Sequence, residues 1–481
     1  MSYSVLISYH INYVKTYKGD NMKTTSRIFV VLSADGIGAP IAYKLQQKGK
    51  TVYYGQVSSY DKIHVKTDED PEGKKRRLKL YDGLIKNKMD ADALVKQLLT
   101  VGNPERYFIW CDFNWLWPYA DKLRKAGFQG FFPTKRDSEL EKDRDSAKKL
   151  VEKLYKDVVV GEHYDFKNVS EAIKFLSTAS DRAFCLKGNN EDAPTIVPKN
   201  DDPVFNHMRL IDALQKFERD YNRNGLILEE KILDAHEICA QAITMNGKVI
   251  GVNCDIEVKG IGGADTGTQS GCSMDLVVQL PIKGEFYDKF LRPREHLMVR
   301  PGEMTIFDLS VYYSPSRDDF FFGEFCENRP GYNAFFTEIA THNSVADYFD
   351  KIIAEAELYD KSVKQFGASF RVFNMSDDSK FPKKKRAGSL ITANPADKNC
   401  WLWDIYKDDE GKLRTVGMDD NLGCITGSGD SLEEAAKNAY AGIKKNDLLD
   451  DFSRSLADYM DESYLTSIPK RYNLMKKMGV L

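Results

Sequence analysis

The sequence predicts a protein of several domains and mixed class, α/β in its N-terminal part and α+β in the remainder. Two observations lead to this prediction. Between residues 27 and 133, short apolar runs alternate with helical segments, which is typical of a doubly wound parallel sheet. Beyond residue 137, strand-like and helical runs are mixed without that regular alternation. The 481 residues suffice for roughly two to four domains.

The N-terminal doubly wound domain is expected at 27–137, after an N-terminal extension at 1–26. Its first element is Arg27–Leu32, whose apolar and β-branched residues indicate a buried parallel strand. A glycine-rich turn and a helix follow, and Gly49 marks the end of that helix. The other elements expected in this domain are helices at 41–47, 94–99 and 120–125 and strands at 51–54, 107–111 and 131–133.

The remainder of the chain is expected to be α+β, with a boundary near residue 365 and a small C-terminal α+β domain at 366–481. Asn246-Gly247 lies between two strand-like runs and indicates a two-residue hairpin turn. The expected helices are 138–156, 347–361 and 432–445, and the expected strands are 183–187, 226–230, 239–245, 248–254, 304–313, 320–325, 369–373, 401–404 and 422–426.

The bulk composition argues against several classes of partner. The net charge of −3 gives no basic field that would attract nucleic acid or anionic lipid, and the basic run Lys383–Arg386 is more typical of a solvated loop. No apolar run approaches the ~18 residues of a membrane-spanning helix. The eight cysteines are scattered without a C-x-x-C pair, which indicates free thiols in a reducing cytoplasm.

Basic and acidic side chains follow several of the expected strands in an order that suits a nucleotide. Lys187 ends an apolar strand beside a short loop, from which it could reach phosphate oxygens; a solvated lysine is the alternative. Glu229 and Glu230 end the next strand, whose backbone could hydrogen-bond adenine, and Glu237 follows at a distance that could serve ribose. Such acids are usually surface charges when considered alone.

The sharpest group of polar residues lies near the ends of the two strands expected at 304–313 and 320–325. Asp308 belongs to the first and Glu324 to the second, and Glu327 and Asn328 follow the second. Converging oxygen ligands suit Mg²⁺ that bridges carboxylates and phosphates, and Arg329 would face a transferred phosphate. Solvent-facing charges on an edge hairpin are the alternative.

A glycine-rich segment, Gly260–Gly271, carries small hydroxyl and amide side chains. Its backbone N–H groups could approach an anionic ligand closely. An ordinary surface loop is the alternative interpretation.

These segments, in this order and spacing, resemble glycinamide ribonucleotide synthetase (phosphoribosylamine–glycine ligase), a member of the ATP-grasp superfamily, over nearly all of residues 27–446. Leu186-Lys187-Gly-Asn-Asn resembles the family's Ile-Lys-Ala-Asp-Gly. Residues 229–237 resemble its Glu-Glu-Phe-Leu-x-Gly-x-Glu hinge, and 324–329 resemble its Glu-Phe-Asn-x-Arg strand. Residues 265–274 resemble its Asp-Thr-Gly-Pro-Asn-Thr-Gly-Gly-Met-Gly loop, and 422–440 match its C-terminal strand, glycine turn and helix.

The resemblance implies an ATP-grasp fold, with a pre-ATP-grasp domain at 27–137 and an ATP-grasp domain at 138–365 that includes a small lid at about 157–232. It implies a carboxylate–amine ligase that uses ATP and Mg²⁺ (or Mn²⁺), passes through an acyl phosphate and releases ADP and phosphate. The implied partners are a small carboxylate and a small amine, with no membrane or nucleic acid, and the chain would be a cytoplasmic monomer or homodimer.

The resemblance also implies residue roles. The residues implied for the nucleotide are Arg144, Lys187, Glu229, Glu230, Ile232 and Glu237. Those implied for the substrates are Gly36, Gly38, Asp265, Thr266, Gly267, Gln269 and Ser270. Those implied for the metal are Asp308 and Glu324 with either Asn328 or Glu327, and those implied for catalysis are Lys187 and Arg329.

Departures from the family pattern affect the expected substrates. The family's Gly-x-Gly-Gly-Arg-Glu-His loop is replaced by Ala34–Pro40, without Arg or His, and its phosphate flap by Asn189–Pro194, without a second lysine. We therefore expect altered substrates. Two alternatives stay open: a true phosphoribosylamine–glycine ligase of purine biosynthesis, and a non-catalytic nucleotide-binding protein of the same fold.

Overall fold

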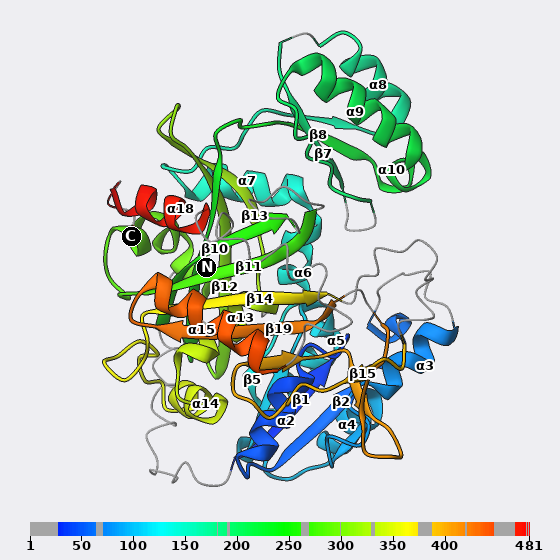
Figure 1. The fold of residues 1–481 in the computed structure, drawn as a ribbon, viewed down its shortest axis with the longest axis vertical. Helices are drawn as coiled ribbons and strands as arrows, with labels where there is room; N and C mark the ends of the chain where they lie inside the picture. The colour runs from blue at the N-terminus through cyan, green and yellow to red at the C-terminus, as the bar shows by residue number, and fades with distance from the viewer. Residues whose placement is uncertain are drawn as a thin grey trace, which may run out of the picture.

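A computed structural model describes residues 27–63, 71–179, 181–189, 193–260, 269–298, 300–328, 332–373, 387–418, 421–446, 467–477, 479 and 481. Figure 1 shows a large mixed sheet with helices packed against it and a smaller unit, built around β7 and β8, that projects from one end. The large sheet has 13 strands, and two further sheets have three strands each.

The bounds of the elements follow in chain order. The strands of the large sheet are β1 Ile28–Ser33, β2 Val52–Gln56, β3 Lys88–Asp90, β4 Tyr107–Cys111, β5 Gln129–Phe131, β9 His236–Met245, β10 Lys248–Gly260, β11 Gln269–Leu280, β12 Glu303–Ser314, β13 Asp319–Phe325, β14 Phe366–Phe373, β16 Cys400–Leu402 and β19 Asn421–Gly429. The small sheets are β6 His163–Phe166, β7 Phe184–Gly188 and β8 Leu226–Glu230, and β15 Leu390–Ile391, β17 Ile405–Lys407 and β18 Leu413–Thr415. The α-helices are α2 Ala39–Gln47, α3 Pro71–Lys79, α4 Ala91–Leu98, α5 Trp117–Lys125, α6 Lys135–Lys142, α7 Arg144–Leu154, α8 Val169–Leu176, α9 Pro203–Lys216, α10 Glu218–Asn224, α11 Glu285–Phe290, α12 Glu295–Met298, α13 Tyr332–Thr341, α14 Val345–Ile353, α15 Leu432–Lys445 and α18 Ser467–Lys477.

The N-terminal strands form the parallel part of the large sheet, as the sequence predicts. β1 pairs in parallel with β2 and β4, and β4 pairs in parallel with β5. The strands β1 and β4 are almost fully buried because helices cover parallel strands on both faces. The prediction of a single helix at 138–156 is wrong in one respect, since two helices, α6 and α7, occupy this segment.

Thr134 and Asp137 form a capping box at the start of α6, and Asp143 caps the start of α7.

Strands β9 to β13 form the antiparallel part. Asn246 and Gly247 turn β9 into β10 with φ angles of 53° and 79°, which confirms the predicted hairpin turn. β12 pairs antiparallel with β9 and parallel with β5, so it joins the two parts of the sheet. β11 is not among the predicted strands, since a glycine-rich loop is expected at 260–271 and no element at 272–280. β10 in fact extends to Gly260 and β11 begins at Gln269.

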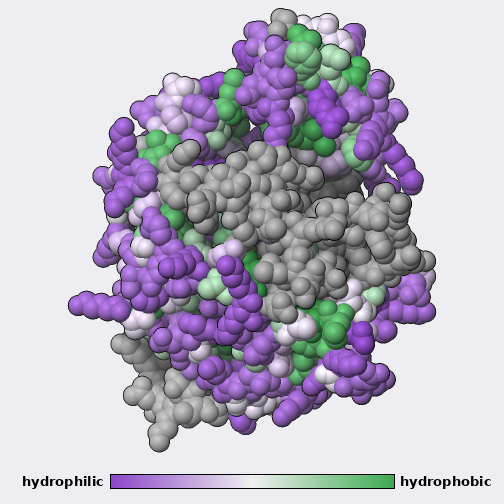
Figure 2. All heavy atoms as spheres, viewed as in Figure 1, coloured by the Kyte–Doolittle hydropathy of each residue, from purple (hydrophilic) through white to green (hydrophobic). Residues whose placement is uncertain are grey.

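The projecting unit has its own sheet and core. β8 lies between β6 and β7, and helices α8, α9 and α10 pack on that sheet through a separate hydrophobic cluster that includes Leu186, Leu210 and Leu228. Hydrophobic colour gathers at the top of Figure 2, over this unit, where Val204 and Phe205 are exposed. We call this unit, residues 163–230, the lid.

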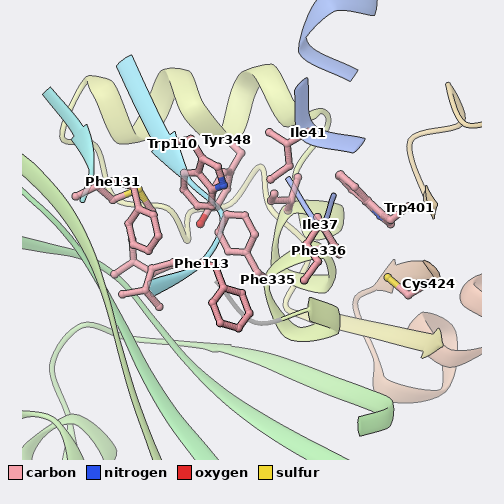
Figure 3. Close-up of a cluster of buried hydrophobic side chains, with 14 of the residues drawn as sticks. Ile37, Ile41, Trp110, Phe113, Phe131, Phe335, Phe336, Tyr348, Trp401 and Cys424 are labelled. Atoms are coloured by element: carbon pink, nitrogen blue, oxygen red, sulfur yellow. The ribbon is translucent and has the colours of Figure 1, made fainter. Parts of the chain in front are cut away.

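Three C-terminal strands complete the large sheet, whereas β15, β17 and β18 form the second small sheet. β14 pairs with β11 and β19, and β16 pairs with β19. Figure 3 shows the aromatic core through which α13 contacts both β4 and β16. Phe335 of α13 stacks on Trp110 of β4, and Phe336 stacks on Trp401 of β16, each with ring centroids 4.8 Å apart. A domain boundary at residue 366 stays a prediction.

All eight cysteines are free, and six of them are buried. Within the described part of the chain, no helix combines the length and apolar character that crossing a membrane requires.

Candidate active site

Two lysines from different elements meet one carboxylate beside the lid. Lys187 Nζ on β7 lies 2.5 Å from Glu229 Oε2 on the neighbouring strand β8, and Lys148 Nζ on α7 lies 2.9 Å from Glu229 Oε1. Burial alone would raise the pKa of Glu229, but the two lysines hold that pKa at about 2. The Glu229 carboxylate therefore stays ionised and holds two ammonium groups at one point.

The first turn of α7 adds a third cation. Arg144 Nη2 lies 3.9 Å from Glu324 Oε2 on β13. Arg144 and Lys148 are four residues apart, so they share one face of α7. Burial raises the pKa of Glu324, but the charges of Arg144, Lys259 and Lys187 together lower it. Glu324 thus lies within electrostatic reach of the lid lysine, and the lid and the large sheet contribute to the same site.

Asp308 lies on the same face of the adjacent strand. Ser310 of β12 is opposite Glu324 in register, and Asp308 precedes Ser310 by two residues. Gln241 Nε2 donates to Asp308 Oδ2 at 2.9 Å, whereas Asp308 Oδ1 has no hydrogen-bond partner within the described residues. Burial raises the pKa of Asp308 to about 7 despite the Gln241 hydrogen bond, and Glu324 adds to the rise.

These two carboxylates fit a Mg²⁺ site. They supply hard oxygen donors on one face of neighbouring strands, and Asp308 Oδ1 lacks a hydrogen-bond partner within the described residues. A divalent cation would relieve the repulsion between the two carboxylates. The charges of Arg144 and Lys187 act on Glu324, and Lys148 shares Glu229 with Lys187. Cations of the kind that phosphate binding requires therefore lie beside Glu324.

Glu237 is the second residue of β9 and lies beside this group. It accepts a hydrogen bond from Ser310 Oγ at 2.7 Å, and its carboxylate lies 3.3 Å from Lys259 Nζ. Lys259 also lies 2.5 Å from Glu257. Glu237 is buried, so it is no surface charge; its role with ribose stays a prediction.

Two of the predicted metal ligands make other contacts. Glu327 forms an ion pair with Arg294, and each side chain is only 1% exposed. Asn328 Oδ1 accepts from the backbone N–H of Ile306 at 2.8 Å, and its Nδ2 donates to Asp137 Oδ2 at 2.8 Å. These contacts fix the turn after β13, although Glu327 Oε2 has no hydrogen-bond partner within the described residues. Of the four candidate ligands, Asp308 and Glu324 are the pair that lies on one face of neighbouring strands, and metal binding by Glu327 or Asn328 stays a prediction.

The glycine loop after β1 also differs from the expectation. The backbone N–H of Gly38 donates to Asp112 Oδ2 at 2.8 Å, and that of Ala34 donates to Asp112 Oδ1 at 3.0 Å. The N–H of Gly36 donates to Ser33 Oγ at 2.8 Å. Both glycine N–H groups are therefore committed within the protein, and substrate binding through them is not supported.

Of the remaining predicted residues, some lie within the described part of the chain and others lie outside it. Glu230 lies 2.6 Å from Arg317, and Ile232 follows β8 in the link to β9. Gln269 and Ser270 open β11. The predictions for Asp265, Thr266, Gly267 and Arg329 lie outside the described residues.

Three residues of the site were not singled out from the sequence. Lys148 follows Arg144 by one helical turn, so helical spacing could have identified it. Lys259 alternates with Glu257 along β10, a period-two pattern that a strand interpretation would have revealed. Asp112 follows a predicted buried strand, but its partners are 74 to 79 residues away, and no local pattern indicates them.

Comparison with known proteins supports the fold and leaves the substrates open. Neither a family model nor a curated protein matches the sequence. Among solved structures, phosphoribosylamine–glycine ligase from Thermotoga maritima matches with a TM-score of 0.55 and 14% identity, over 87% of this chain and 96% of that one. The biotin carboxylase domain of Hydrogenobacter thermophilus 2-oxoglutarate carboxylase, solved with MgADP and bicarbonate, matches with a TM-score of 0.56 and 14% identity, over 93% and 98%.

A third similar structure is carboxyaminoimidazole ribonucleotide synthase from Aspergillus clavatus, in complex with ATP, with a TM-score of 0.52 and 13% identity over 88% of this chain and 99% of that one. All three proteins are ATP-grasp enzymes. The chain has the ATP-grasp fold, which confirms the fold predicted from the sequence.

Proposed function

We propose that the protein is an ATP-dependent carboxylate–amine ligase that forms an acyl phosphate and releases ADP and phosphate. One observation carries the proposal: the cations Lys148, Lys187 and Arg144 converge with the Asp308–Glu324 pair where the lid meets the large sheet. This arrangement supplies both charges that nucleotide phosphates and their metal require. The ATP and ADP complexes of the similar structures support it.

In this mechanism the protein contributes binding, orientation and charge. Lys187 and Lys148 leave Glu229 in part to bind phosphate oxygens, and Arg144 stabilises the charge that develops on the transferred phosphoryl group. Asp308 and Glu324 would hold Mg²⁺, which when bound neutralises the β- and γ-phosphate oxygens. The substrate carboxylate oxygen attacks the γ-phosphorus and the bond to ADP breaks.

The second step joins the amine to the activated carboxylate. The amine nitrogen attacks the acyl carbon, the bond from that carbon to the phosphate oxygen breaks, and phosphate leaves while the nitrogen loses a proton. No side chain serves as a nucleophile, since positioning and exclusion of water suffice for both steps. The lid carries Lys187, so its closure would bring that lysine to the phosphates and protect the acyl phosphate.

The substrates differ from phosphoribosylamine in this proposal. The Ala34–Gly38 loop gives its N–H groups to Asp112 and Ser33, so an anionic substrate group there would have to displace the Asp112 carboxyl group. A phosphate-bearing amine is therefore disfavoured at this loop. We place the enzyme in a reducing cytoplasm, in keeping with its eight free cysteines, as a monomer or homodimer.

The test begins with nucleotide binding. Thermal unfolding of the full chain is followed with ATP, with Mg²⁺ and with both, and we expect the largest stabilisation with both together. ADP release is then screened with amino acids as carboxylates against a panel of amines that includes phosphoribosylamine with glycine. Release with that pair would identify the family's own reaction and contradict altered substrates.

A variant pair tests the metal assignment. Glu324→Gln keeps the shape of the side chain but removes one anionic ligand, so it should abolish ADP release and reduce the stabilisation by Mg²⁺·ATP. Glu139→Gln, an exposed residue of α6 paired with Lys135, is the matched control and should behave as the wild type. Binding of Mg²⁺·ATP by the wild type without ADP release from any pair would favour the non-catalytic alternative.

A further inference from the structure

A second group of carboxylates lies on the polar face of the large sheet, beyond the metal pair. Asp255 and Glu257 alternate along β10, and Asp275 of β11 is opposite Glu257 in register. One ligand atom from each of Cys239, Asp255 and Glu257 lies within 4.8 Å of the others, and the same holds for Glu257, Cys272 and Asp275. We call these five residues the acidic floor; its side chains are spaced so that one cation can contact several of them.

Several polar atoms of this region have no hydrogen-bond partner. Asp255 is 0% exposed, and neither of its carboxylate oxygens is bonded within the described residues. Ser369 is directly opposite Asp275 on β14 and is also 0% exposed, and no described residue bonds its Oγ. Asn253 lies two residues before Asp255 on the same face, and its Oδ1 also has no hydrogen-bond partner within the described residues. Because an unpaired buried polar group is destabilising, these atoms point to a ligand that donates hydrogen bonds.

The nearby cations compensate the carboxylates unequally. Lys259 lies 2.5 Å from Glu257, and the charge of Arg371 acts on Asp275. Asp255 is left with the smallest compensation. Burial, followed by repulsion from Asp275 and Glu257, raises the pKa of Asp255 well above its usual range, and only Lys259 opposes the rise among the charges that act most strongly on it. A positively charged ligand would relieve this repulsion.

We propose, on the basis of the proposed ligase function, that the acidic floor holds an ammonium group of the amine substrate, with Asp255 as its main partner. The substrate would then be a diamine, or an amine with a second cationic group. The floor shares a sheet face with Asp308, which acts electrostatically on Asp255, so a molecule anchored there extends toward the acyl phosphate. One ammonium group binds at the floor at N···O distances of about 2.8 Å, and the other amine, unprotonated, attacks.

The Ala34–Gly38 loop and the acidic floor favour the same kind of amine. The Ala34–Gly38 loop is filled by the Asp112 carboxylate, which disfavours an anionic amine, and the acidic floor favours a cationic one. An organic ammonium is favoured over a thiolate-bound metal, because burial, followed by neighbouring carboxylates such as Asp275 and Asp308, raises the pKa values of Cys272 and Cys239 well above the usual range and keeps both thiols protonated.

Calorimetry with defined probes tests the proposal. The full chain is titrated with 1,4-diaminobutane and with 1-aminobutane, with and without Mg²⁺ and a non-hydrolysable ATP analogue. We expect the diamine to bind at least about tenfold more tightly than the monoamine. Asp255→Asn should remove this preference and leave binding of the ATP analogue unchanged, since the variant side chain cannot become the carboxylate that pairs with an ammonium group. Asp350→Asn, which breaks a peripheral ion pair with Lys50, is the control.

The possible outcomes are separable. Nucleotide binding without any diamine preference, or a preference that survives in Asp255→Asn, overturns the cationic subsite and leaves the ligase proposal intact. Failure to bind the ATP analogue overturns the ligase proposal instead. If Mg²⁺ or Mn²⁺ alone binds in an Asp255-dependent way, the floor is a metal site and the ammonium proposal is wrong. Should Asp255→Asn fail to fold, Asp275→Asn is titrated in its place and the same criteria decide.

Discussion

Gly38 and Asp112, 74 residues apart in the chain, are joined by a 2.8 Å hydrogen bond from the glycine N–H to Asp112 Oδ2. A Cβ atom at Gly38 would lie only 2.9 Å from the Asp112 Cβ, so glycine is needed for this close approach. The Ala34 N–H and the Ser33 hydroxyl donate to the same carboxylate. The donors of the loop thus converge on a carboxyl group of the protein itself, and burial raises the pKa of Asp112 to about 7 despite these hydrogen bonds.

This internal carboxyl group can be exchanged for an external anion. Asp112→Ala leaves the donors of the loop without an acceptor, and we expect it to lose about 3 kcal/mol of unfolding free energy. Sulfate should then restore part of the melting temperature, because it can occupy the vacated position. Melting in sulfate and in chloride at equal ionic strength measures this, with the wild type showing the general effect of sulfate. An equal response of both proteins would contradict the anion assignment.

Local patterns predict much of this fold. The strands at 107–111 and 226–230 and the helix at 432–445 have the predicted bounds, because apolar periodicity and clear end signals agree there. Two features absent from the predictions, the break between α6 and α7 and the strand β11, are indicated by local sequence patterns. Thr134 and Asp137 form a capping box that marks a new helix, and the alternation of polar and apolar residues from Cys272 to Leu280 indicates β11.

Local sequence patterns predict only some of the residues of the candidate site. Lys187, Asp308 and Glu324 follow strand patterns and could be predicted from their positions. The partnerships of Asp112 with Gly38 and of Asn328 with Asp137 span 74 and 191 residues, and only tertiary packing creates them. Glycines and a polar residue after a strand suggest ligand binding locally, whereas here they bond to each other.

Lys148 should bind nucleotide phosphate. Lys148→Met removes one charge-assisted contact worth about 1.5–3 kcal/mol, so the Kd for Mg²⁺·ATP should rise roughly 10- to 100-fold. The neighbouring Lys149 is exposed and pairs with Asp145, which makes Lys149→Met a matched control with wild-type affinity. Calorimetric titration measures both; equal affinities in the two variants would remove Lys148 from the site.

The paired Glu229 should make the fold sensitive to acid. Its folded pKa of about 2 lies below the unfolded value of about 4.3. The stability that Glu229 contributes is therefore fully present above the unfolded pKa and is lost as the pH falls through the folded one. The loss is at most about 3 kcal/mol.

Urea unfolding at several pH values between about 5 and 2 tests this. The wild type should lose more stability over that range than Glu229→Gln, which cannot titrate. Glu152→Gln, on an exposed position of α7, should keep the wild-type slope. Parallel curves for the wild type and Glu229→Gln would show that the lysine contacts do not lower this pKa.

Asn328 should prove structural rather than metal-binding. It has a φ of 47°, a left-handed conformation that asparagine tolerates better than alanine, and its amide joins Ile306 to Asp137. Asn328→Ala should therefore cost about 2–4 kcal/mol of stability, measured by urea unfolding. The folded variant should keep its affinity for Mg²⁺·ATP, the reverse of the pattern expected for Glu324→Gln. Weakened Mg²⁺ binding with unchanged stability would return Asn328 to the metal set, because a metal ligand contributes to binding, whereas a buried amide bonded to Ile306 and Asp137 contributes to stability.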